Sequence, residues 1–115
     1  MTRTALDKFC LSLPGATVSV QWGDHQVYKV GGKMFAVTSA RGTLSFKAND
    51  VAFEMLTETG LARPSPYMAR AQWLFVDDVK DFPARELRQY IAQSHALVAK
   101  KLTRKAQREL GLVTA

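Results

Sequence analysis

Residues 26–47 read QVYKVGGKMFAVTSARGTLSFK and carry the strongest structural signal in the chain. Three segments rich in β-branched and aromatic residues are separated by two pairs of turn residues. The segments are Gln26–Val30, Lys33–Ala40 and Thr43–Lys47, and the turn pairs are Gly31-Gly32 and Arg41-Gly42. Two-residue connections of this kind favour tight hairpin turns, because glycine adopts positive φ without steric cost. The stretch therefore predicts an antiparallel meander.

These two turns also predict which side of the sheet is apolar. Across the first turn, Tyr28 is expected to face Phe35, and across the second, Val37 is expected to face Phe46. Because successive side chains of a strand point to opposite faces, the apolar ones gather on one side. The predicted core face comprises Tyr28, Val30, Phe35, Val37, Leu44 and Phe46. The other, partly solvated face comprises Val27, Lys29, Met34, Ala36, Thr38, Thr43, Ser45 and Lys47.

Helical periodicity and capping residues predict the elements on either side of the meander. They are a helix over Thr4–Leu13 capped by Thr4, a strand over Val18–Trp22, a helix over Val51–Thr59, a loop over Ala62–Arg70, a strand over Gln72–Val76, a helix beginning near Pro83, and a short helix from Thr103 to Leu110. The order α-β-β-β-β-α-β-α predicts a two-layer α+β fold. In that fold a five-stranded antiparallel sheet carries its helices mainly on one face.

Composition places the chain among globular proteins with one domain, 1–115. Its 115 residues are 47% hydrophobic and 23% charged, which excludes intrinsic disorder. The single cysteine excludes a disulfide framework and a cysteine-rich zinc site. No apolar run approaches the roughly 18 residues of a membrane span, and no signal-peptide core is visible. We therefore expect a cytoplasmic protein without membrane contact.

Positive charge is concentrated near the end of the chain. The net charge is +6, and segment 100–108 holds five cations and no acid. The remaining residues are nearly neutral, with eleven basic and ten acidic side chains. A local patch attracts a polyanion better than diffuse charge does. A role in solubility, or in complementing the negative end of a helix dipole, remains an alternative.

Residue patterns for catalysis are missing from the sequence. Cys10 falls on the apolar stripe of the first predicted helix and is expected to be buried. His25 is expected to bond a turn, and His95 to lie on a helix surface. The acidic turn around residues 77–81 lacks the ligand spacing of a calcium loop. The sequence therefore predicts a non-enzymatic protein with no metal or cofactor.

Short motifs in a fixed order resemble the MmcQ/YjbR family over nearly the whole chain. They are LPGAT at 13–17, VGGKMFA at 30–36, LSFK at 44–47, PYM at 66–68 and WLFVD at 73–77. The resemblance implies a small two-layer fold shaped like secretion chaperones, and DNA binding through a double-wing motif. The family's lysine after Gly-Gly maps onto Lys33, its tyrosine after proline onto Tyr67, and its late tryptophan onto Trp73.

The leading hypothesis is a weakly sequence-specific DNA-binding protein that contacts backbone phosphates. The candidate phosphate-binding residues are Lys33, Arg41, Lys47, Arg70, Lys100, Lys101, Arg104 and Lys105. One alternative is a chaperone-like module or homodimer that docks through the mixed sheet face around Met34, Ala36 and Thr38. Another is a small-ligand pocket near His25, Tyr67 and Trp73.

Overall fold

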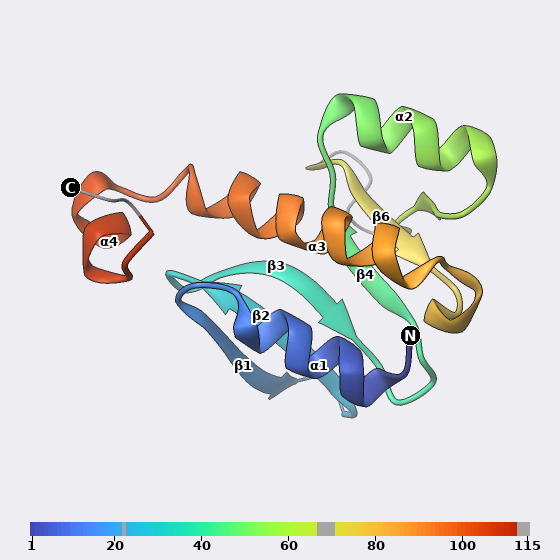
Figure 1. The fold of residues 1–115 in the computed structure, drawn as a ribbon, viewed down its shortest axis with the longest axis horizontal. Coiled ribbons are helices and arrows are strands. Elements are labelled where there is room, and N and C mark those ends of the chain that lie inside the picture. Colours follow the sequence, from blue (N-terminus) through green and yellow to red (C-terminus); the bar gives the residue numbers. More distant parts are fainter. Residues whose placement is uncertain (22, 67–70, 113–115) are drawn as a thin grey trace.

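A computed structural model describes residues 1–21, 23–66 and 71–112 and shows a six-stranded antiparallel sheet with helices on one face (Figure 1). The strand order is β1-β2-β3-β4-β6-β5. The strands are β1 (Ala16–Gln21), β2 (His25–Val30), β3 (Lys33–Thr38), β4 (Leu44–Lys47), β5 (Arg63–Pro64) and β6 (Trp73–Val76). The helices are α1 (Arg3–Ser12), α2 (Asp50–Thr59), the 3-10 turn η2 (Val79–Asp81), α3 (Ala84–Ala99) and α4 (Arg104–Glu109). The predicted two-layer α+β fold is confirmed.

Two local expectations were wrong. The segment predicted as a loop contains β5, a two-residue edge strand that pairs with β6. The cap of α1 is Thr2, whose side chain accepts a hydrogen bond from the Ala5 N–H, and Thr4 lies inside the helix. Asn49 or Asp50 could each cap α2 by sequence, and the structure assigns the cap to Asn49. The predicted cap of α4, Thr103, is confirmed.

The predicted pairing of the meander is correct at Val30 and Lys33 but shifts by one residue further along. Tyr28 pairs with Ala36 and not with Phe35, because a bulge leaves Phe35 without a cross-strand partner. Ala36 therefore joins Phe35 in the core, and Val37 points to the opposite face. A β-bulge of this kind inserts one extra residue into one strand and reverses the alternation beyond it.

The second turn is longer than predicted and shifts the strand register in the direction opposite to the bulge. Thr38 pairs with Leu44, so the turn spans five residues, 39–43, and not two. Backbone hydrogen bonds from Gly42 N to Ser39 O and from Ser39 N to Thr43 O close it. This displacement offsets the bulge, and so Leu44 and Phe46 remain on the predicted core face.

Two apolar clusters result, one on each face of the sheet. The larger one joins α1, α2 and α3 to the sheet and includes Leu6, Cys10, Tyr28, Val30, Phe35, Ala36, Leu44, Phe46, Leu56, Leu74, Leu87, Ile91 and Val98. The smaller one consists of Val27, Val37 and Trp73, with Met34 partly buried beside it. Burial of Cys10 confirms its predicted core position, and burial raises the pKa of its thiol to about 12.

Candidate nucleic-acid interface

Three lysines from three separate elements converge near the end of α3. Lys33 begins β3, Lys47 ends β4, and Lys101 lies just beyond α3. Burial and the positive charges of Lys101 and Lys33 together lower the pKa of Lys47 below its ordinary value of 10.5. Cations held this close repel one another, and a bound anion is favourable beside them.

Lys47 is held in place by a serine on the neighbouring helix. The Ser94 hydroxyl donates to the Phe35 carbonyl at 2.7 Å and accepts from the Lys47 N–H at 2.9 Å. These two backbone groups belong to β3 and β4. They lie just beyond the pair Ala36–Phe46, the last pair of these two strands, and Phe35 is also the residue that the bulge against β2 leaves unpaired. Ser94 is fully buried, so this bridge fixes α3 against the sheet beside Lys47.

Lys33 is held close by packing at the tip of the β2–β3 hairpin. Leu102 lies directly against Gly31, where an added Cβ would come within 2.6 Å of a Leu102 methyl carbon. Gly31 and Gly32 both adopt positive φ, as the predicted turn requires. The glycine turn therefore lets the end of α3 approach the hairpin, which brings Lys33 toward Lys101.

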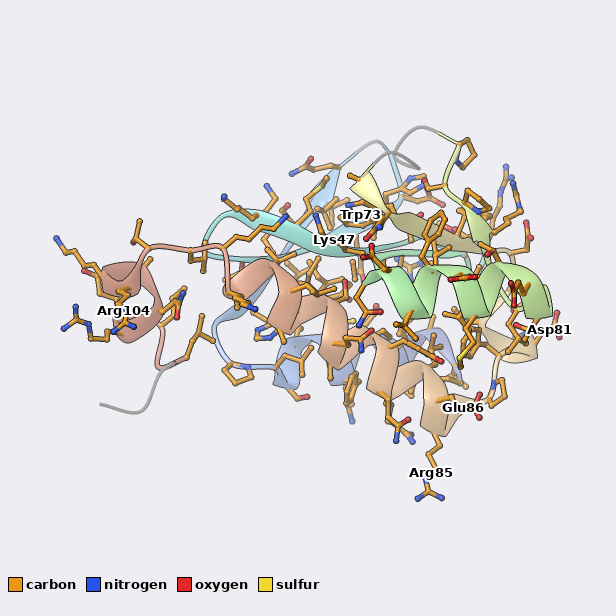
Figure 2. The ribbon with its side chains drawn as sticks, turned by 90° about the horizontal axis from the view of Figure 1, so that it is seen from above. Lys47, Trp73, Asp81, Arg85, Glu86 and Arg104 are labelled. Atoms are coloured by element: carbon orange, nitrogen blue, oxygen red, sulfur yellow. The ribbon has the colours of Figure 1, made fainter. Side chains whose placement is uncertain are left out.

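Additional cations extend this surface onto α4. The helix begins at Thr103, whose hydroxyl accepts from the Ala106 N–H, and Leu110 packs on Gly15. Arg104 projects away from the body of the protein (Figure 2). Within the described residues, no carboxylate forms an ion pair with a cation of segment 100–108. We call the exposed or half-buried cations Lys33, Lys47, Lys100, Lys101, Arg104, Lys105 and Arg108 the basic end.

Acidic residues gather at the opposite end of the molecule. Asp81 and Glu86 lie at one end in Figure 2 and Arg104 lies at the other. Seven of the ten acids belong to α2, to the segment before α3 or to the first turn of α3, namely Asp50, Glu54, Glu58, Asp77, Asp78, Asp81 and Glu86. A polyanion is therefore attracted to one end and repelled by much of the other.

One predicted phosphate contact, Arg41, does not join the basic end. Arg41 is exposed in the β3–β4 turn, at the opposite end of β3 from Lys33. It lines a hollow of about 320 Å³ with Asp24, His25, Ser39, Thr43 and Phe75. Arg70 lies outside the described residues. The two hairpin tips are thus at opposite ends of one strand, and only the tip that carries Lys33 contributes to the basic end.

The predicted docking face is not available as proposed. Ala36 and Thr38 are buried, at 0% and 1% exposure, because the bulge and the long turn place both on the helix-covered side. Two of the predicted ligand-pocket residues have different surroundings. Trp73 is buried with Val27 and Val37, whereas His25 lines the hollow beside Arg41. Trp22 and Tyr67 lie outside the described residues.

His95 is buried, contrary to the expectation of a helix-surface position. Its Nε2 atom lies 2.7 Å from the Pro14 carbonyl, and its ring stands edge-on against Phe35. The residue borders a hollow of about 370 Å³ between α3 and α4. The buried face of α3 is wider than a single stripe because the helix packs against α1 as well as the sheet.

Two aspartates of the acidic turn have polar partners within the protein. Asp77 forms a bidentate ion pair with Arg63, which raises the pKa of the arginine and lowers that of the carboxyl. Asp78 accepts from the Lys80 N–H at the start of η2. Among the described residues, no group of three or more His, Cys, Asp or Glu side chains could hold a metal ion. None of the described helices is long and apolar enough to cross a membrane.

Comparison with known proteins identifies relatives of the chain. The model of the YjbR family matches residues 11–97. The crystal structure of Deinococcus radiodurans protein DR2400, which carries a DUF419 domain, is similar with a TM-score of 0.85 and 28% identity. That similarity covers 97% of this chain and 89% of the other. No curated protein matches significantly. Because the family model covers most of the chain, this protein belongs to the YjbR family.

Proposed function

We propose that this protein binds DNA at the basic end, through backbone phosphates and without catalysis. The observation that carries the proposal is the convergence of Lys33, Lys47 and Lys101 from three elements. Unpaired lysines on one flexible segment are common on soluble proteins. Here the fold holds three lysines so close together that the pKa of Lys47 is lowered. Their repulsion destabilises the free protein, and a bound anion would relieve it.

Affinity would come mainly from the release of counterions. Lysines and arginines that neutralise phosphates displace condensed cations, so the binding constant falls steeply as salt rises. The lysine cluster would contact one stretch of backbone, and the exposed cations Arg104 and Lys105 of α4 would contact a neighbouring stretch. Binding of this type has little sequence specificity.

A charge-reversal experiment tests this assignment. The triple variant Lys101→Glu, Arg104→Glu, Lys105→Glu removes cations from the basic end. Its matched control, Lys80→Glu, Arg85→Glu, Arg88→Glu, makes the same charge change at exposed positions near the other end. Affinity for a short labelled duplex is measured by fluorescence anisotropy at about 50 and 200 mM salt.

The first triple variant is expected to lose about 100-fold or more in affinity at the lower salt. The control triple variant is expected to lose much less, through the change in net charge alone. Circular dichroism establishes that both variants remain folded. Equal losses in the two variants, or wild-type affinity that does not depend on salt, would contradict binding at the basic end.

A further inference from the structure

The two edges of the sheet differ in every feature that governs strand pairing. The β5 edge has only two residues, one of them a proline, and Arg63 there is paired with Asp77. The β1 edge has six residues, ATVSVQ, with no charge and no proline. All six pair with β2 in an uninterrupted register from Ala16 to Gln21. Short strands, charges, prolines and bulges are the usual protection of a sheet edge, and β1 has none of them.

Exposed apolar side chains accompany this unprotected backbone. Val18 is 41% exposed and Val20 is 67% exposed, and they are the only large hydrophobic residues of a strand among the exposed ones described. The two valines point to the same face, since they are two residues apart. Val18 pairs with Tyr28, so this is the face that the helices cover. The opposite side of β1 is polar, where the Gln21 amide donates to the Ser19 hydroxyl.

We propose that β1 pairs antiparallel with β1 of a second copy of this chain, with Ser19 on the two-fold axis. In that register Val18 of one copy faces Val20 of the other, and the two-fold axis generates this valine contact twice. Thr17 of one copy likewise faces Gln21 of the other on the polar side. The outer hydrogen-bonding groups of both strands are satisfied, and the two sheets become one.

Charge distribution favours this occupant over a foreign strand. The two-fold axis of an antiparallel pair is perpendicular to the sheet, so both helix layers lie on the same side. Rotation by 180° also carries the basic ends to opposite ends of the dimer. β1 begins beside α4, because Gly15 packs on Leu110, and runs away from it (Figure 1). The pairing is therefore self-complementary and keeps the two positive regions, which would repel each other, far apart.

The dimer is expected to be weak and concentration-dependent. Pairing five residues of each strand covers less than the roughly 1,200–2,000 Å² of a standard interface. Sedimentation equilibrium of the full chain up to about 1 mM, where weak pairs assemble, measures the association. Val20→Lys places a charge within the valine contact. Val51→Lys is the matched control, because Val51 on α2 is similarly exposed, at 70%, and far from the edge.

We expect the wild type and Val51→Lys to dimerise alike, and Val20→Lys to weaken dimerisation at least about tenfold. A wild type that remains monomeric at the highest concentration overturns the proposal. So does a dimer that Val20→Lys leaves intact. Thermal unfolding of the monomers, at low concentration, shows whether the lysine damages the fold itself.

Oxidative cross-linking tests the register independently. Ser19→Cys places two thiols opposite each other across the axis, with Cα atoms about 4.5–5.5 Å apart, within disulfide range. Thr17→Cys places them about 14 Å apart, beyond that range. Cys10 is fully buried and does not compete. Cross-linking of Ser19→Cys in preference to Thr17→Cys is expected, and equal yields would exclude this pairing.

Discussion

The two ends of α3 carry opposite charge and are built in different ways. At the Ala84 end, the aspartates of residues 77–81 are neighbours in sequence. Asp78 accepts from the nearby Lys80 N–H, and Asp77 pairs at the surface with Arg63 of β5. At the Ala99 end, the lysines come from β3, β4 and the residues after α3. The acidic end therefore depends on a local turn and one exposed contact with β5, whereas the basic end exists only once the sheet and α3 have packed together. Disturbing that packing should damage the basic end far more than the acidic end.

Ser94→Ala is expected to have the largest effect on stability. It leaves the Phe35 carbonyl and the Lys47 N–H without their buried partner. Each unsatisfied group costs about 1–3 kcal/mol, so for the two groups we expect a loss of about 2–6 kcal/mol in the free energy of unfolding. Urea denaturation measures this, and duplex affinity should fall as well because Lys47 loses its anchor. Gln93→Ala, at the preceding half-buried position of α3, is the control, and an equal loss there would mean that truncating any polar side chain on α3, and not breaking the bridge, is responsible.

Gly31→Ala should have the next largest effect, and Gly32→Ala is its matched control. Both glycines have positive φ, at 59° and 79°, so alanine strains the backbone at either position. Only at Gly31 does the new Cβ also collide with Leu102. We expect about 1 kcal/mol of destabilisation for Gly32→Ala and about 1–2 kcal/mol more for Gly31→Ala. Weaker duplex binding in Gly31→Ala alone would show that this contact assembles the basic end, whereas equal effects would assign them to backbone strain.

Lys47→Met should separate function from stability. It keeps the apolar stem and removes a charge that Lys101 and Lys33 oppose, so stability at neutral pH should rise by up to about 0.5 kcal/mol. Affinity for duplex should fall several-fold, because one phosphate contact is lost. A fall in stability at neutral pH would contradict the inference that Lys101 and Lys33 repel Lys47.

The same residue gives a pH dependence with a defined sign. The pKa of Lys47 is lowered in the folded state, so between that pKa and 10.5 the unfolded chain binds more protons. Stability contributed by this residue therefore rises with pH across that window. Duplex affinity falls across the same window, because the phosphate binds the charged form. Both trends should be reduced in Lys47→Met, and identical profiles in the two proteins would exclude Lys47 from the site.

Asp77→Asn at the acidic end should have the smallest effect. Its ion pair with Arg63 is exposed, and exposed pairs contribute little to stability. We expect stability close to that of the wild type and unchanged duplex affinity. A loss as large as that of Ser94→Ala would mean that the contact between Asp77 and Arg63 contributes to the packing of the acidic end. Thermal unfolding at low and high salt measures the difference.

Local signals predicted most of the elements correctly, and failed where neighbouring elements decide a residue's position. The Gly31-Gly32 turn, the Asn49 cap and the end of α2 at Gly60 depend on backbone preferences within a few residues. The bulge at Phe35 does not, because it forms where Ser94 of α3 binds the Phe35 carbonyl. His95 is similar: its burial depends on Pro14, which is distant in sequence.

The candidate site was predicted as a set of charges but not as an arrangement. Lys33, Lys47 and Lys101 were all named from the sequence, yet so was Arg41, which lies at the other end of β3. One signal for the convergence was present, because Leu102 continues the apolar stripe of α3 past the end of the helix. An apolar residue there requires a surface to pack on, but the periodicity does not say that the surface is Gly31.

The sequence by itself determined the fold class, the strand order of the meander, the end of α2 at Gly60, the start of α4 after Thr103 and the excess of positive charge, since each follows from periodicity, turn residues or composition. Only the tertiary structure decided which cations meet, which face receives Val37, and which sheet edge remains open. Those properties depend on contacts between residues far apart in the chain, and such contacts form only when α3 crosses the sheet and brings Ser94 and Leu102 against β3, β4 and the hairpin.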